Sequence, residues 1–147
     1  MPATATSDAA AWRVIESALA ATGWCKRVQI GEPKSPPEPI TACILGDSGE
    51  IPATDLGAPH ELHRVILRFY APFLEEPEEQ VELDLEQIRA NIWADINADF
   101  ELGGNIAFIW PTGCSWRWGN LEIGHQMYRI LDMTIAYYVH DRAPFTA

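Results

Sequence analysis

The residues of this chain that could do chemistry do not form a recognised catalytic pattern. The two histidines of the HELH run at 60–63 are three positions apart, whereas the helical zinc-protease motif needs histidines four apart. Ser48, His125 and Asp132 offer a nucleophile, a base and an acid, but no Gly-x-Ser-x-Gly turn carries the serine. These spacings favour ordinary side chains over a catalytic or metal site.

The cysteines and the glycine pair offer no clearer chemistry. Cys25, Cys43 and Cys114 are odd in number and widely spaced, so we expect reduced thiols that are buried or half-buried. Gly103-Gly104 follows the expected long helix instead of preceding one, which indicates a helix-ending turn and not a phosphate-binding loop. The sequence therefore predicts no enzyme activity, no metal and no cofactor.

The charge balance argues against nucleic-acid binding. Acidic residues outnumber basic ones by 21 to 10, which gives a formal net charge of −11. A binder needs Lys and Arg to displace counterions from phosphates. Much of the acidic charge gathers at the start of the long helix, at Glu75, Glu76, Glu78, Glu79, Glu82, Asp84 and Glu86. This cluster fits the positive end of the helix dipole, or else an acidic interface or lumen.

Length and composition predict one domain. A chain of 147 residues with 48% hydrophobic residues can bury one core, which we place in residues 8–142, between a flexible segment 1–7 and a tail 143–147. No apolar run approaches the ~18 residues of a membrane helix. The first ten residues lack the basic and apolar regions of a secretory signal, so synthesis in the cytoplasm is expected.

Periodicity predicts two helices among several strands. One helix begins at Ser7 or Asp8 and ends near Thr22, with Gly23 as its stop. The other starts near Gln80, ends at the glycine pair, and carries an apolar stripe of Leu85, Ile88, Ile92, Ile96 and Phe100. Five segments are expected as strands: Trp24–Ile30, Ile40–Leu45, Leu62–Ala71, Asn105–Trp110 and Gln126–Asp141. Three are expected as loops: Gly31–Pro39, Gly46–His60 and Pro111–Gly124.

This order of elements predicts an α+β fold. We expect a mainly antiparallel sheet of four to five strands, with two helices packed on one face. Two strands alternate clearly, with Val65, Leu67 and Phe69 on one face of the first, and Leu131, Met133, Ile135, Tyr137 and Val139 on one face of the second. The opposite face is mixed polar and aromatic. That mixture is typical of an interface rather than of plain solvent surface.

Candidate interface residues follow from this alternation. Tyr128, Asp132 and Tyr138 lie on the mixed face of the closing strand, where we expect them to meet a neighbouring subunit. Arg64 and Arg68 lie on the non-core face of their strand, and we expect them to pair with a neighbour's acidic helix start.

The run Trp116-Arg117-Trp118 is expected near the tip of the loop 111–124. Exposed Trp and Arg are the residue types that anchor protein interfaces, so partner contact is one interpretation. The other is that one Trp folds over the sheet edge while its neighbour shields an apolar seam. Stacking on single-stranded nucleic acid is disfavoured by the surrounding negative charge.

Two segments of the second half resemble a known family. Ile88–Ile109, IRANIWADINADFELGGNIAFI, resembles the helix-to-strand passage of the tail terminator, or tail-completion, proteins of long-tailed bacteriophages. The closing strand Tyr128–Asp141, YRILDMTIAYYVHD, is similar to their final sheet strand. The resemblance covers most of Leu62–Asp141. The first third matches in layout only, as an N-terminal helix and a loop-separated hairpin, and its Pro-rich loop departs from the pattern.

The resemblance implies a structural role in the virion. Such proteins form a homo-hexameric ring on the head-proximal end of the tail tube, which ends tube polymerisation and joins the tail to the head connector. The implied partners are the tail tube protein and the head–tail connector protein, while genomic DNA passes through the lumen without specific binding. From their length, we expect the loops Gly31–Pro39 and Gly46–His60 to reach the tube or the connector. The alternatives are a connector or other minor tail protein, an intracellular protein-binding module outside phages, and an enzyme.

Overall fold

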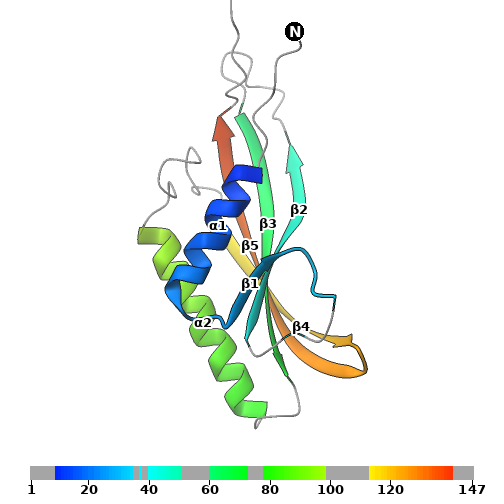
Figure 1. Ribbon diagram of the computed structural model, residues 1–147. Coiled ribbons are helices and arrows are strands. Elements are labelled where there is room, and N and C mark those ends of the chain that lie inside the picture. Colours follow the sequence, from blue (N-terminus) through cyan, green and yellow to red (C-terminus); the bar gives the residue numbers. More distant parts are fainter. Residues whose placement is uncertain are drawn as a thin grey trace, which may run out of the picture.

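The residues that the structure describes form a single five-stranded sheet with two helices. The computed structural model describes residues 9–34, 37, 40–50, 60–72, 78–98 and 113–140. The helices are α1 (Ala9–Thr22) and α2 (Glu78–Ala98), and the strands are β1 (Arg27–Ile30), β2 (Thr41–Glu50), β3 (His60–Pro72), β4 (Cys114–Ile123) and β5 (Gln126–His140). The strand order is β1-β2-β3-β5-β4, and every neighbouring pair is antiparallel except β1 with β2 (Figure 1). The predicted α+β class is confirmed.

Both helices pack on the same face of this sheet. Leu19 of α1 and Leu85 of α2 belong to one buried cluster with Leu67 of β3 and Leu131 of β5. The predicted inward faces of β3 and β5 are confirmed for Val65, Leu67, Phe69, Leu131, Met133, Ile135 and Tyr137. The side chain of Val139, the remaining predicted member, lies outside the described residues. Because side chains alternate along a strand, the even-numbered residues of β3 and β5 lie on the other face of the sheet, called the open face below.

The helix boundaries follow local rules. α1 ends at Gly23, whose φ of 73° only glycine adopts without strain, as predicted. α2 buries Val81, Leu85 and Ile92 along one stripe. The predicted continuation of α2, the Gly103-Gly104 turn and the strand Asn105–Trp110 lie outside the described residues.

The first two strands are parallel, so the predicted hairpin is wrong. Arg27 pairs with Thr41 and Ile30 with Ile44 in parallel register. The segment 31–40 therefore carries the chain back to the end at which β1 began. Ten residues span up to ~33 Å when extended. A four-residue strand such as β1 is only ~13 Å long, so this return needs no helix.

β2 extends further than predicted. The expected loop 46–60 is wrong in its first part, because β2 continues to Glu50 through an irregularity between Gly46 and Ser48. Gly, Asp and Ser in this stretch are typical of turns, but here they accommodate a bulge. Gly46 also allows a close approach, since a Cβ at this position would lie 2.9 Å from Cη2 of Trp12 in α1.

The expected loop 111–124 is wrong as well, because most of it is β4. The strand pairs with β5 through a two-residue turn, Gly124-His125, with φ values of 57° and 68°. The apolar residues of β4 change sides partway along: Trp118 packs on the helix-side core, whereas Leu121 and Ile123 pack on the open face. Apolar and polar residues therefore do not alternate in one phase along the whole strand. The turn end of this hairpin curves away from the helices (Figure 1).

Candidate functional site

A second, smaller buried cluster lies on the open face. Cys43, Tyr70, Tyr128 and Ile130 form it, and each is at most 7% exposed. The ring centroids of the two tyrosines are 6.2 Å apart in an edge-to-face arrangement. The Tyr128 hydroxyl donates to the carbonyl of Pro37, at 3.3 Å, so the connection between β1 and β2 is fastened over this part of the sheet.

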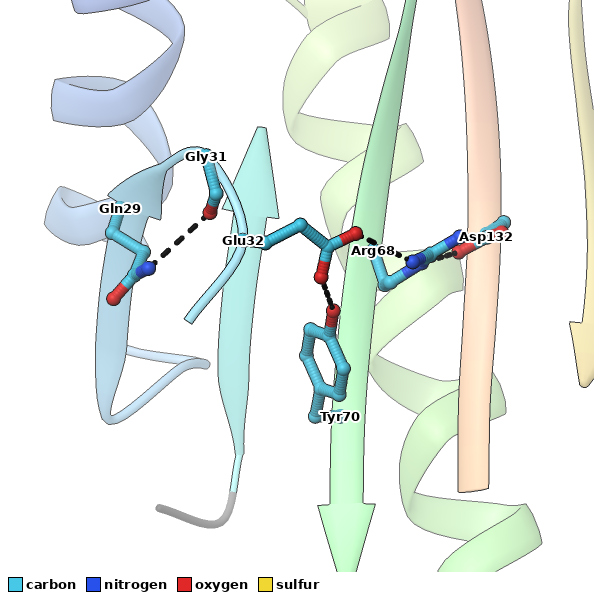
Figure 2. Close-up of polar contacts among 6 residues, drawn as sticks. All are labelled: Gln29, Gly31, Glu32, Arg68, Tyr70 and Asp132. Atoms are coloured by element: carbon cyan, nitrogen blue, oxygen red, sulfur yellow. Dashed lines mark hydrogen bonds and ion pairs between the residues drawn. The ribbon is translucent and has the colours of Figure 1, made fainter. Parts of the chain in front are cut away.

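A polar network of Glu32, Arg68, Tyr70 and Asp132 crosses this face (Figure 2). Arg68 forms a bidentate pair with Asp132, with Nε–Oδ1 at 2.7 Å and Nη2–Oδ2 at 3.0 Å. A third donor, Nη1, reaches Glu32 Oε1 at 2.8 Å, and the Tyr70 hydroxyl donates to Glu32 Oε2 at 2.7 Å. Figure 2 shows the network in front of the sheet, with helices behind it. We call these four residues the open-face network.

Elements far apart in sequence position this network. Arg68 and Asp132 are directly opposite each other in the β3–β5 register, so their side chains leave the sheet side by side. Glu32 follows Gly31, whose φ is 92° and whose carbonyl accepts a hydrogen bond from the Gln29 amide at 3.2 Å (Figure 2). This turn aims the Glu32 carboxylate back over β2 towards β3. The network therefore anchors the β1–β2 connection to the sheet.

Burial and hydrogen bonding hold the titratable groups here in one protonation state. The hydrogen bond to Asp132 raises the pKa of Arg68, which remains charged. Burial, and then the bond to the Glu32 carboxylate, raises the pKa of the Tyr70 phenol, which remains neutral. Burial raises the pKa of the adjacent Cys43 thiol to about 12. Since the thiolate is the nucleophile, such a thiol is unreactive at neutral pH. The arrangement is suited to holding a conformation.

The residues predicted as partner contacts mostly have partners within the chain. Arg68 and Asp132 bind each other, and Arg64 contacts Glu50 at 3.2 Å. Tyr128 is buried in the smaller cluster. For Tyr138 the structure gives only its register position opposite Leu62. Their proposed role in contacting a neighbour stays a prediction.

Trp116 and Trp118 face the helix side, where each meets an arginine. Trp116 lies under the guanidinium of Arg89, 3.9 Å from its ring centroid, and Arg89 pairs with Glu86 of the same helix. Trp118 has the guanidinium of Arg129 at 5.1 Å. Two Glu–Arg–Trp stacks thus fasten the edge strand β4 to α2. Trp116 nevertheless stays 47% exposed.

The second of these stacks uses another part of the acidic cluster. Arg129 binds Glu82 with Nε–Oε1 at 2.5 Å, and also donates to the Asn120 side chain at 3.1 Å.

Glu32, Arg89 and Arg129 were not identified from the sequence as members of these contacts. Glu32 and Arg129 bind acids or bases 36 or more positions away, which no local spacing marks. The i,i+3 spacing of Glu86 and Arg89 could have marked their pair, but its stack on Trp116 depends on a strand that was expected as a loop.

Three basic side chains remain without a partner in the described part of the chain. Arg27, Lys34 and Arg117 make no hydrogen bond or ion pair with another described residue. Arg117 lies on the open face beside a hollow of about 450 Å³, which is also lined by Ile66, Thr134 and other residues of β2, β4 and β5. Arg27 and Lys34 share a different hollow of about 280 Å³ at the β1 side.

The residues considered for chemistry are not assembled into a site. His63 stacks on Tyr137 and contacts Glu61 at 3.1 Å, and the side chain of His60 lies outside the described residues. His125 lies in the hairpin turn, seven residues from Asp132 along one strand. That separation corresponds to ~23 Å.

Neither a metal cluster nor a membrane span is found among the residues that the structure describes. Within these ranges, no group of three or more His, Cys, Asp or Glu side chains could hold a metal ion. In the same part of the chain, no helix is both long and apolar enough to cross a membrane. Comparison with models of known protein families and with curated proteins gives no match.

Proposed function

We propose that this chain is a structural virion protein of a long-tailed bacteriophage, a tail terminator with no enzymatic activity. Six copies form a ring on the head-proximal end of the tail tube, end its polymerisation and join the tail to the head connector. The ring needs no cofactor. Genomic DNA passes through its lumen without specific binding, as suits a chain with a net charge of −11.

The observation that supports an assembly role best is the uncovered part of the open face. One face of the sheet is covered by both helices, but beside Arg117 the other face leaves Ile66 and Thr134 only partly buried, around the hollow of about 450 Å³. Mixed polar and apolar surfaces of this kind are typical of protein contacts. The exposed Trp116 at the sheet edge adds a residue type that is enriched in interfaces.

The identity of the assembly is supported by the sequence resemblance. Ile88–Ile109 and Tyr128–Asp141 resemble the tail terminators, and the second segment includes most of β5, the strand between β3 and β4. The raised pKa values of the Cys25, Cys43 and Cys114 thiols, caused mainly by burial, favour a structural role over nucleophilic catalysis.

Cryo-electron microscopy tests this proposal directly. The purified chain would be mixed with tail tubes, and the particles with which it co-purifies would be imaged in parallel. We expect a six-fold ring at the head-proximal end of each tube. Density at the portal or at the tail tip would instead assign a connector or minor tail role. No association with any tube or particle would leave a protein-binding module outside phages and refute the proposal.

A further inference from the structure

The pairing of charges inside the chain identifies which basic groups remain for a neighbour. The sequence suggested Arg64 and Arg68 as partners of a neighbour's acidic helix start. Arg64 is already engaged by Glu50, and Arg68 by Asp132 and Glu32. Arg27 and Lys34, in contrast, have no partner among the described residues.

These two basic residues line one hollow. It holds about 280 Å³ and lies between β1, the start of β2 and the connection that joins them. Ile30, Pro33 and Pro37 supply an apolar part of its wall. Glu32 lines it too, but its carboxylate oxygens bind Arg68 and Tyr70. The hollow therefore presents two positive charges that no described residue pairs, beside an apolar wall, on a chain that is strongly negative overall.

The same pairing identifies which acids of α2 remain available. Glu82 binds Arg129 and Glu86 binds Arg89, so these two are engaged within the chain. Glu79 is exposed and makes no hydrogen bond or ion pair with another described residue. One helical turn later, Leu83 is 56% exposed, the largest exposed fraction among the big apolar side chains described. Residues four apart share one face of a helix, so Glu79 and Leu83 form a single strip.

The hollow and the strip lie at opposite edges of the sheet. The hollow adjoins β1, which is one edge strand. Near its start, α2 is bound through Glu82 to Arg129 of β5, and further along the helix Arg89 stacks on Trp116 of β4, the other edge strand. Because they lie at opposite edges, the hollow and the strip of one chain cannot contact each other. Between copies they produce a head-to-tail contact, the type that closes into rings.

We propose that the Glu79–Leu83 strip of a second copy of this chain docks into the hollow lined by Arg27 and Lys34. The Glu79 carboxylate lies between the two basic groups, and Leu83 packs against Ile30 and Pro33. The contact combines charge complementarity, which sets specificity and orientation, with burial of an exposed leucine. It assigns the subunit contact of the proposed ring and so rests on the proposed function.

Charge reversal and charge exchange test this contact in the full-length chain. The variants are Arg27→Glu, Lys34→Glu and Glu79→Lys, together with the combinations of Glu79→Lys with each of the other two. Arg13→Glu changes the net charge equally at an exposed arginine of α1 outside the hollow, and Asp95→Lys does so at an exposed acid of α2 outside the strip. Self-association would be measured by sedimentation velocity and by co-pelleting with tail tubes.

Each single reversal is expected to weaken self-association ~10-fold or more, since it places like charges together. Each combination restores the opposite signs and should recover most of that loss, and the two controls should associate as the wild type does. Unchanged association in the single variants, or a combination no better than its parents, overturns this contact. If wild-type rings still form on tubes in that case, the proposed function stands. A wild-type chain that never self-associates, with or without tubes, overturns both.

Discussion

Replacing Asp132 by Asn tests whether the open-face network stabilises the fold. The Asp132 side chain is 9% exposed, and its two oxygens accept hydrogen bonds of 2.7 and 3.0 Å from Arg68. Removing one partner of a buried ion pair costs ~3–5 kcal/mol. Asn keeps one acceptor oxygen, and Arg68 keeps Glu32 at 2.8 Å as a counter-charge. We therefore expect a loss of about 2–3 kcal/mol in the free energy of unfolding.

Urea unfolding followed by the fluorescence of the six tryptophans measures this loss. Glu50→Gln is the matched control. It removes the partner of Arg64 in a pair whose side chains are 36% and 55% exposed, so it should cost less than ~0.5 kcal/mol. The double variant Arg68→Met with Asp132→Leu removes both buried charges. It should unfold within ~1 kcal/mol of the wild type.

Two results would refute the reasoning. If the urea midpoint of Asp132→Asn equals that of the wild type, the charged bidentate pair stabilises the fold no more than a neutral amide does. A double variant as unstable as Asp132→Asn would mean that the loss does not come from leaving the Arg68 charge unpaired. In either case the β1–β2 connection is held to the sheet by the apolar cluster around Tyr70 and Tyr128.

Three further predictions concern the core, the hairpin turn and alkaline pH. Gly46→Ala should cost ~1–3 kcal/mol in urea unfolding, since the added Cβ would lie 2.9 Å from the ring of Trp12, which is also held by a 3.1 Å hydrogen bond to Tyr137. If the added substitution Trp12→Phe does not reduce this loss, the clash with Trp12 is not its cause. His125→Gly should raise the free energy of unfolding by ~0.5–1 kcal/mol, because His125 has a φ of 68° in a two-residue turn. An unchanged or lower free energy of unfolding in this variant would contradict backbone strain at His125. Burial raises the Cys25 pKa from 9.0 to about 11, so the unfolded state loses this proton first as the pH rises, and the free energy of unfolding should fall between those pH values. Cys25→Ala should make this fall less steep. An unchanged slope in the variant would exclude the Cys25 thiol as its cause.

The parts of the fold that the sequence predicted are those set by local pattern. β3 and β5 each keep one apolar face over many residues, because each contributes to a single core from end to end. α1 likewise shows a stripe at helical spacing and a glycine stop. In these elements buried residues recur with the period of the helix or strand, so the sequence of the segment alone predicts its secondary structure and its buried face.

The parts that were mispredicted depend on contacts made elsewhere in the chain. β4 contributes to the helix-side core at Trp118 and to the open face at Leu121, so its pattern changes phase and resembles a loop. The parallel pairing of β1 with β2 depends on the reach of the segment 31–40, which its proline content does not reveal. The need for glycine at position 46, beside the bulge, comes from the ring of Trp12 in α1. None of these causes lies within the segment that it shapes.

The ion pairs of the candidate site also could not be predicted from local sequence. Arg68 and Arg117 lie directly opposite Asp132, one on each neighbouring strand, and alternation alone makes them equivalent. Only Arg68 forms the bidentate pair, and Glu32, which returns over the sheet, binds its remaining donor. In a chain with twice as many acids as bases, most of the described arginines are bound by the nearest acid of the same subunit. The basic groups that remain, at Arg27, Lys34 and Arg117, are therefore the ones that a partner's carboxylates can reach without displacing an internal pair.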